Sequence, residues 1–324
     1  MRVTATTEAA ASTAADTVVV GLIEGEGVPH DVEGGALQAL VDAGEAKAKP
    51  RSVAVAHVGG KRWILVGLGS RAKLDAEAIR VAAAVAHGRA KELGAKSVCW
   101  ELPHKAREHH PARAVVEGTL MAAYAFRTFK SKDDNGDGGI DVLLISDHED
   151  RSEAVARAVV VTEAVNAARD LQNTPANHMT PTILGGRARE VAERHSRTLS
   201  CEVVGREEIV ARGMGAFAAV AQGSDEEPAL ITLRYEPADV VDGSPVLGFV
   251  GKGVTFDTGG ISIKPATSMA DMKYDMTGAA AVIEAIGAIA ALQLPVRVIG
   301  VVGATENLLG PRAMKPGDVF TTAA

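Results

Sequence analysis

The segment from Gly251 to Ala280 combines charged side chains and glycines in a pattern that could support chemistry. It reads GKGVTFDTGGISIKPATSMADMKYDMTGAA and contains three lysines and three aspartates, but no histidine, cysteine or glutamate. The apolar residues before it predict a buried strand, and reactive sites in open α/β sheets lie beyond the carboxyl ends of strands. Lys252 follows that strand, Asp257 comes five residues later, and Asp275 shortly precedes an apolar helix, near its positive N-terminal end. With Lys264 between them, two aspartates and two lysines are expected to converge on one crevice.

This pattern fits more than one role. The lysines could bind a phosphate or a carboxylate, and the aspartates could bind a hard divalent metal ion. A solvated loop with incidental ion pairs is the structural alternative. The glycines favour a functional site, because they allow backbone conformations and close approaches that a Cβ atom would block.

The elements that must position these residues alternate between strands and helices along the chain. Buried or alternating apolar runs predict strands, and apolar residues at helical spacing predict helices. Such alternation predicts an α/β fold with parallel or mixed sheets flanked by helices. The main predicted strands are residues 17–24, 52–58, 62–69, 97–102, 139–146, 229–235, 244–251 and 295–304, and the main predicted helices are 36–44, 74–94, 111–129, 149–173 and 278–294.

Two prolines after the long helix mark a connection between domains. The stretch NTPANHMTP starts at residue 173 and stops a helix that begins near residue 149. We therefore predict an N-terminal α/β domain over residues 1–150, a connecting helix over 151–173 and a second domain over 174–324. Within the second domain, the strand–helix–strand unit from Val246 to Ala304 is expected to form a right-handed parallel crossover.

Composition and charge limit the compartment and the partners. Hydrophobic residues make up 47% of the 324 residues, so a large core can form, although aromatic residues make up only 3%. The net charge of −7 disfavours nucleic acid or an anionic membrane as the main partner. Cys99 and Cys201 fit neither a zinc motif nor a redox pair, which suits a reducing compartment. Without a secretory signal or a run of about 18 apolar residues, the chain is predicted to be cytoplasmic and to have no membrane span.

Three short motifs imitate known binding sites without completing them. VGLGSRA at 66–72 resembles a dinucleotide-binding turn, but no acidic residue closes a second strand about 20 residues later. DDNGDGGID at 133–141 imitates a calcium loop, but Leu144 stands where the loop needs a glutamate. GKG at 251–253 lacks the other residues of a phosphate-binding loop. None of the three is interpreted as a binding site.

Longer matches resemble a known family. GKGVTFDTGGISIKP followed by MKYDMTGAAAV strongly resembles the cytosolic leucyl aminopeptidase family, whose members are two-metal exopeptidases. The stretches NTPANHMTPT (173–182), GMGAFAAVAQGS (213–224) and ATENLLGPRAMKPGDV (304–319) are similar to the same family. The resemblance is dense from about residue 173 to residue 319 and looser over residues 1–150. It implies an N-terminal α/β domain joined by a long helix to an α/β zinc-exopeptidase-like catalytic domain.

The resemblance also implies roles for individual residues. Lys252, Asp257 and Asp275 would be metal ligands, and Asp257 would bridge two divalent ions, either Mn²⁺ or Zn²⁺, with Mg²⁺ or Co²⁺ also compatible. Lys264 would be the electrophilic catalyst, and Met272 would line the pocket for the substrate side chain. A lysine can coordinate a metal only as the neutral amine, whereas Lys264 must stay cationic to donate to a developing oxyanion. Two metals roughly 3.5–4 Å apart can activate a water and polarise the scissile carbonyl.

One further motif of the family is not found in these residues. The family pattern continues into N-T-D-A-E-G-R, which supplies more carboxylate ligands and an arginine that holds bicarbonate, whereas this sequence ends at Ala324. We therefore expect a truncated catalytic domain that is inactive on its own and binds at most one metal weakly. For the full-length parent, the resemblance implies a broad, leucine-type aminopeptidase that acts on peptides with a free N-terminus and assembles as a homo-hexamer. A DNA-associated or regulatory role and a pseudoenzyme role are the alternatives.

Overall fold

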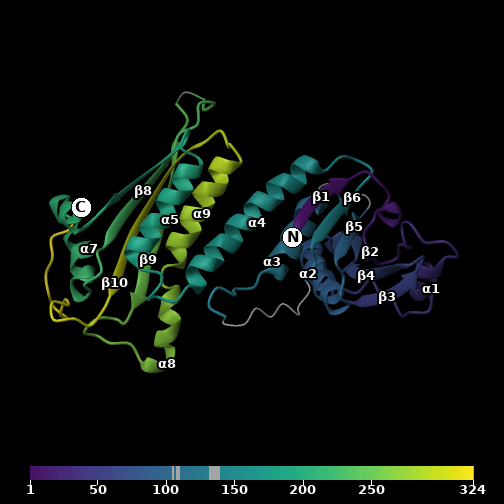
Figure 1. Ribbon diagram of the computed structural model, residues 1–324, viewed down its shortest axis with the longest axis horizontal. Coiled ribbons are helices and arrows are strands. Elements are labelled where there is room, and N and C mark those ends of the chain that lie inside the picture. Colours follow the sequence, from purple (N-terminus) through teal and green to yellow (C-terminus); the bar gives the residue numbers. More distant parts are fainter. Residues whose placement is uncertain (104–105, 107–109, 131–138, 242, 324) are drawn as a thin grey trace. The chain divides into compact units, whose positions relative to one another are not determined.

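The chain forms two compact units, each built on its own β-sheet (Figure 1). The computed structural model describes residues 1–103, 106, 110–130, 139–241 and 243–323. The units cover Met1–Thr162 and Glu163–Ala324, so the predicted α/β class with two α/β domains is confirmed. The division falls inside the long helix α4 (Ser152–Asn173), and the domain limits at residues 150 and 173 stay a prediction. Residues 133–138 of the calcium-loop-like segment lie outside the described residues.

The first unit contains a six-stranded sheet in the order β1-β6-β5-β2-β4-β3. All neighbouring pairs are parallel except β3 and β4, which are antiparallel. All seven residues of β2 are buried, as expected for a strand covered on both faces. The elements are β1 (Arg2–Thr6), η1 (Ala10–Ser12), β2 (Thr17–Ile23), α1 (Ala36–Asp42), β3 (Val53–Val58), β4 (Lys61–Gly69), η2 (Arg71–Lys73), α2 (Ala76–Glu92), β5 (Ser97–Glu101), α3 (Pro111–Ala123) and β6 (Val142–Ser146).

Two cores form because side chains of β2 alternate between the faces of this sheet. Val19 packs in a core with buried residues of α2 and α3. Val18 and Val20 pack on the other face with Leu37 of α1 and Trp63 of β4. The helix predicted over 111–129 is shorter in the structure, where α3 ends at residue 123.

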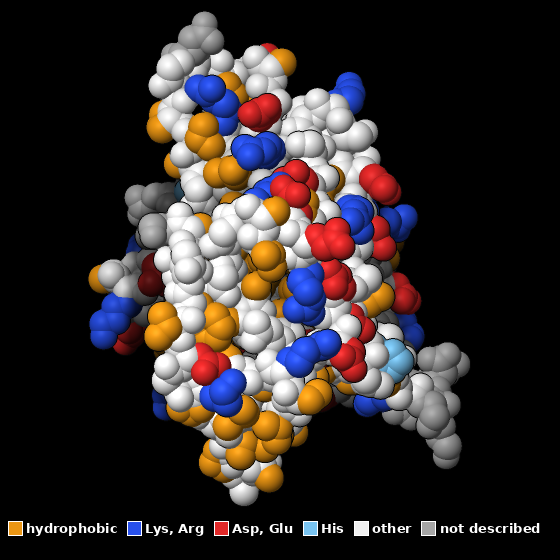
Figure 2. All heavy atoms as spheres, turned by 90° about the vertical axis from the view of Figure 1, so that its left-hand side faces the viewer, with side chains coloured by type: hydrophobic (Ala, Val, Ile, Leu, Met, Phe, Trp, Pro, Cys, Tyr) orange, Lys and Arg blue, Asp and Glu red, His pale blue; other side chains and the backbone are white. Residues whose placement is uncertain are grey.

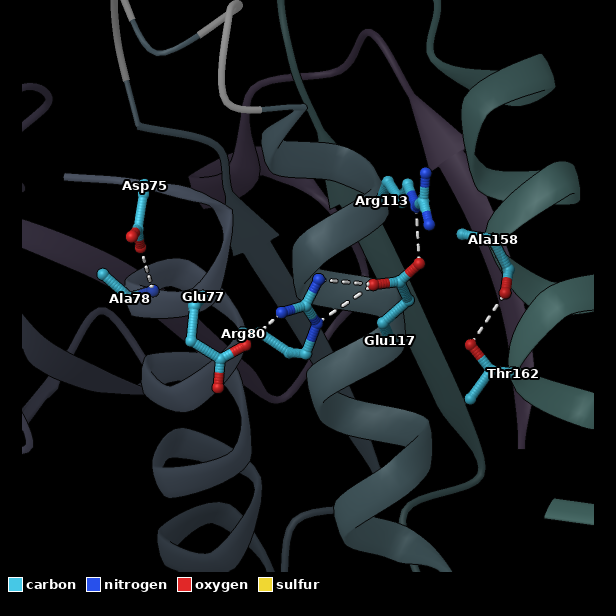
Figure 3. Close-up of polar contacts among 8 residues, drawn as sticks. All are labelled: Asp75, Glu77, Ala78, Arg80, Arg113, Glu117, Ala158 and Thr162. Atoms are coloured by element: carbon cyan, nitrogen blue, oxygen red, sulfur yellow. Dashed lines mark hydrogen bonds and ion pairs between the residues drawn. The ribbon is translucent and has the colours of Figure 1, made fainter. Parts of the chain in front are cut away.

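Helices α2 and α3 are joined by a buried carboxylate (Figure 3). Glu117 is 5% exposed and accepts hydrogen bonds from Arg80 at 3.0 and 2.9 Å and from Arg113 at 2.5 Å. The neighbouring Gly118 lets the helix backbones approach closely, because a Cβ there would lie 2.1 Å from the carbonyl oxygen of Arg80. Arg80 also pairs with Glu77, whose side chain is 65% exposed. One guanidinium therefore has one buried and one exposed carboxylate partner.

Replacing Glu117 with alanine is expected to lower the free energy of unfolding by about 1–3 kcal/mol, because Arg80 and Arg113 lose a buried carboxylate. The matched control is Glu77→Ala, which removes the exposed partner of Arg80 and is expected to change stability by less than about 1 kcal/mol. Urea unfolding of both variants at neutral pH measures the difference. Equal losses for the two variants would show that burial of Glu117 does not matter.

The second unit contains a four-stranded sheet in the order β7-β8-β10-β9. Strand β8 is antiparallel to both neighbours, whereas β9 and β10 are parallel, which confirms the predicted parallel pairing of these two strands. Helices α5 and α9 share a core with one face of the sheet, and α6 and α7 pack in a smaller cluster with Leu230 of β8. The elements are α5 (Pro181–Arg194), β7 (Leu199–Val204), α6 (Arg206–Ala211), α7 (Gly215–Val220), η4 (Ala221–Gly223), β8 (Ala229–Tyr235), β9 (Val246–Asp257), α8 (Ala266–Met269), η5 (Ala270–Tyr274), α9 (Thr277–Ala291) and β10 (Arg297–Asn307).

One stretch, Ala266–Ala291, is long and apolar enough to cross a membrane by length and composition alone. Its second part, α9, packs in the core of the second unit, where Ala280, Ile283 and Ile286 are fully buried. Buried Glu284 of the same helix accepts hydrogen bonds from Arg187 at 2.7 and 2.9 Å. The apolar composition of α9 thus matches its burial against the sheet.

Candidate active site

The candidate residues lie on and after β9, in the second unit. Asp257 is the last residue of β9 and is 9% exposed. Lys252, which we expected beyond the end of this strand, instead lies within it, so this expectation was wrong. The strand continues because β10 pairs with it as far as Asn307, opposite Asp257. An irregular register between Val254 and Phe256 gives β9 a bulge just before Asp257, a feature that re-aims side chains.

Asp257 is held as a carboxylate by three donors. Its Oδ1 accepts hydrogen bonds from the Gly259 backbone N–H and from Asn307 Nδ2, both at 2.8 Å, and its Oδ2 lies 2.5 Å from Lys264 Nζ. Burial alone would raise the pKa of Asp257, but the hydrogen bonds from Lys264, Gly259 and Asn307 outweigh it and lower the pKa. This side chain is therefore an anion at neutral pH, as a metal ligand must be.

Lys264 reaches Asp257 through a tight loop. Gly259 and Gly260 have φ values of +86° and +67°, in the left-handed region that favours glycine. A Cβ at Gly259 would lie 2.5 Å from the Ser262 carbonyl oxygen, so this turn admits no side chain without a backbone shift. Lys264 Nζ also lies 3.2 Å from Met272 Sδ, which brings the predicted electrophile and the predicted pocket residue together.

Asp275 pairs with Lys252. Its Oδ2 lies 3.0 Å from Lys252 Nζ, yet this buried oxygen makes no hydrogen bond, so the contact is an ion pair without hydrogen-bond geometry. A buried carboxylate oxygen with a free lone pair fits a ligand for a cation. The structure thus forms two lysine–aspartate pairs, and the described contacts do not join one pair to the other.

Glycines also bring α9 against β9 at this point. A Cβ at Gly251 would lie 2.7 Å from the Gly278 carbonyl oxygen, and a Cβ at Gly278 would lie 3.0 Å from the Lys252 backbone nitrogen. Because Asp275 lies two residues before α9, this close contact sets its distance from Lys252. Asp257 and Asp275 supply two carboxylates, and the part of the chain described by the structure contains no cluster of three or more His, Cys, Asp or Glu side chains. A metal at this site would therefore depend on lysine as a ligand.

Exposed apolar side chains occur in the same segments as the charged residues. Ile261, Ile263 and Tyr274 are exposed in the segment that carries Lys264 and Met272, and Leu309 is exposed after β10. Figure 2 views the molecule from the left-hand side of Figure 1. Hydrophobic side chains gather at the lower end of that view, at the level of α8 in Figure 1. Such a surface suits an apolar ligand group better than a phosphate.

Sequence reasoning missed Asn307 as a member of the site. Asn307 ends β10 and reaches Asp257 only because the two strands pair in register over their last residues. A prediction that ended both strands several residues early could not place these two side chains opposite each other. The motif ATEN, which resembles the family, contains Asn307 and was the one signal that marked this position.

Two models of one family match the chain. The "Cytosol aminopeptidase family, N-terminal domain" matches residues 6–133, and the "Cytosol aminopeptidase family, catalytic domain" matches residues 166–324. The chain belongs to the cytosol aminopeptidase family. The resemblance found in the sequence is therefore confirmed, including its looser part over the N-terminal unit.

Curated relatives and solved structures align with almost the whole chain. The probable cytosol aminopeptidases of Roseiflexus castenholzii and Solibacter usitatus are 39% and 40% identical to it, over 99% and 95% of the chain. The bottromycin maturation enzyme BotP in complex with Mn superposes with a TM-score of 0.81 at 33% identity over 95% of the chain. A mutant of tomato leucine aminopeptidase superposes with a TM-score of 0.85 at 25% identity over 99% of the chain. The chain spans 63–66% of the length of these four proteins.

Proposed function

We propose that this chain carries part of the two-metal site of an aminopeptidase that removes N-terminal residues, of leucine type and broad range, from peptides. The observation that carries the proposal is the buried Asp275 oxygen, which has no hydrogen bond and lies beside Lys252. Membership of the cytosol aminopeptidase family supports the reaction, and BotP, a related structure, is described in complex with Mn. The donor set of carboxylates and an amine fits Mn²⁺, Zn²⁺, Mg²⁺ or Co²⁺.

Lys252, Asp257 and Asp275 would hold the metal, and Asp257 would face both ions. Bound divalent ions would polarise the scissile carbonyl and lower the pKa of water. Lys264, beside the Asp257 carboxylate, would donate a hydrogen bond to the oxygen on which negative charge develops. Met272, in contact with Lys264, and the exposed Ile261 and Ile263 would bind an apolar N-terminal side chain.

The 324 residues taken alone are proposed to be inactive and to bind at most one metal weakly. Three side chains would serve one ion, but only Asp257 would serve the second, and a single carboxylate is a weak site. For the whole protein we propose a cytoplasmic homo-hexamer that uses bicarbonate, on the basis of the family resemblance alone.

Titration of the purified 324-residue chain with Mn²⁺, followed by the loss of the free-ion EPR signal, tests the metal site. We expect about one ion per chain with a Kd weaker than about 1 μM, and no hydrolysis of leucine p-nitroanilide. Absence of Mn²⁺ binding would contradict the ligand assignment. Robust hydrolysis by this chain would contradict its proposed inactivity but would support the aminopeptidase assignment.

Asn307→Ala is expected to weaken Mn²⁺ binding about 10- to 100-fold, the range seen when a group that orients a metal ligand is removed. Asn307 donates to Asp257 Oδ1 and so fixes the orientation of the carboxylate. Asn307→Asp is the informative second variant, because it keeps the size but replaces the donor with a second anion. The same EPR titration measures both variants. Unchanged Mn²⁺ affinity in Asn307→Ala would show that Asn307 does not contribute to the metal site.

A further inference from the structure

A cavity in the first unit lies at the edge of the sheet where its parallel strands end. It has a volume of about 160 Å³ and is lined by residues that follow β1, β2, β5 and β6. Thr7 and Glu8 follow β1, His30 follows β2, Glu101 ends β5, and His148 follows β6. Parallel strands end at the same edge, so residues distant in sequence meet at one place. None of these residues belongs to the metal site proposed in the second unit.

The topology of the sheet singles out this edge as a binding position. From β2 the chain continues to β4 on one side, whereas from β5 it continues through α3 to β6 on the other side. A switch point lies between two neighbouring strands whose connections lead toward opposite edges of the sheet. Ligands of open α/β sheets bind beyond the strand ends at such points. His30 and Glu101 lie at this switch point, with His30 Nδ1 2.5 Å from Glu101 Oε1.

The groups around the cavity select the charge of a ligand. Glu101 is largely buried, with 11% of its side chain exposed, and the ring of His148 meets that of His30 edge-on at 5.5 Å. Four carboxylates line the cavity, from Glu8, Asp31, Glu101 and Asp147, and its described lining includes no lysine or arginine.

Three of the four carboxylates already have a partner. Asp31 accepts from three backbone N–H groups, one of them just after it and two at the start of α1. Asp147 binds Arg151 at 2.5 Å, and Glu101 binds His30 through Oε1. The carboxylate of Glu8 and the second oxygen of Glu101, Oε2, remain to meet a ligand.

The remaining walls are apolar. Trp63 is 3% exposed and Leu102 is 5% exposed, and a short run of alanines, 9–11, closes another side. An apolar cavity of about 150 Å³ holds benzene, so this one has room for a ligand of about six non-hydrogen atoms. A bare metal ion is a poor match, because the described residues contain no cluster of three or more His, Cys, Asp or Glu side chains arranged to hold one.

We propose that this cavity binds a small organic cation, namely a primary amine on a short apolar body. The ammonium group lies against Glu101 and Glu8, and the apolar body lies against Trp63 and Leu102. A charge-assisted hydrogen bond to a largely buried carboxylate is stronger than one between neutral groups, so the cation is favoured over a neutral molecule of the same shape. This site is independent of the aminopeptidase activity proposed above.

Pentylamine, 1-pentanol and pentanoate are matched probes, because they differ mainly in charge. Each is titrated into the 324-residue chain while the histidine ring signals are followed by NMR. We expect pentylamine to shift the signals of His30 and His148 with a Kd of about 1 mM or tighter. 1-Pentanol should bind at least about 10-fold more weakly and pentanoate more weakly still. The signal of His57, exposed on β3, is the internal reference and should not move.

Glu101→Gln tests the recognition of charge and should weaken pentylamine binding at least about 10-fold with little effect on 1-pentanol. Glu8→Gln is a second test that leaves the fold intact, because Glu8 is exposed. Equal affinities for pentylamine and 1-pentanol would overturn the proposal, and so would unchanged pentylamine binding in both variants. The absence of any saturable shift up to about 10 mM pentylamine would overturn it as well.

Discussion

Gly251→Ala is expected to destabilise the second unit by about 1–3 kcal/mol and to separate Lys252 from Asp275. The added Cβ would lie 2.7 Å from the Gly278 carbonyl oxygen and 2.8 Å from the Ala279 Cα. Both are backbone atoms of α9, so no side-chain rotation can relieve the contact. Forcing an extra methyl into such a contact costs about 1–3 kcal/mol, and the helix must move away from β9.

The same movement should damage the metal site. Lys252 follows Gly251 on β9, and Asp275 comes just before α9, so their 3.0 Å contact depends on the distance between strand and helix. We expect Mn²⁺ affinity to fall at least about 10-fold, because loss of a group that only orients a metal ligand already weakens metal binding by about 10- to 100-fold. Urea unfolding and the EPR titration with Mn²⁺ measure the two effects on the same protein.

Gly248→Ala is the matched control for this prediction. Gly248 lies on the same strand, and a Cβ there would have no atom within 4 Å. It should leave Mn²⁺ affinity unchanged and stability within about 0.5 kcal/mol. If Gly251→Ala behaves like Gly248→Ala, the close approach of α9 to β9 does not set the geometry of the site.

Local sequence patterns predicted the elements of the fold better than their ends. Apolar runs placed most strands and the longer helices of both units but did not mark β1, and the strand–helix–strand pattern predicted that β9 and β10 are parallel. The predicted strand 244–251 stopped six residues before Asp257, because glycine, lysine and aspartate are poor strand formers. Pairing with β10 overrides that local preference, and this pairing is not visible in either strand alone.

The site shows the same division between local and long-range information. Residue types marked Lys252, Asp257, Lys264 and Asp275 as reactive, and family resemblance supplied their expected roles. The hydrogen bond from Asn307 to Asp257 joins residues 50 positions apart and depends on strand register. The need for glycine at position 251 likewise depends on α9, which lies more than 20 residues further along the chain. Such requirements follow from packing, so they could be found only in three dimensions.

Asp257→Asn should cause the largest loss of Mn²⁺ affinity of any single substitution, at least about 100-fold. This loss exceeds the one expected for Asn307→Ala, which removes only a group that orients the ligand. The substitution removes the anion that would face both metal ions. It also leaves Lys264 without the carboxylate that lies 2.5 Å from its Nζ. Asp271→Asn, an exposed position in η5, is the matched control and should bind Mn²⁺ as the unmodified chain does. Similar affinities for Asp257→Asn and Asp271→Asn would exclude Asp257 as a ligand.

The pH dependence of stability separates the ionised carboxylate from a merely polar side chain. The pKa of Asp257 is lowered in the folded chain because hydrogen bonds from Lys264, Gly259 and Asn307 outweigh burial, which raises it. Folding is therefore favoured by this group above its unfolded pKa of about 3.9, and the contribution is lost as pH falls through the lower folded pKa. Without metal, Asp257→Asn should be less stable than the unmodified chain by about 1–3 kcal/mol at pH 7. Urea unfolding from pH 7 downwards should show this gap closing only below about pH 4, whereas a constant gap would mean that the amide and the carboxylate differ in packing alone.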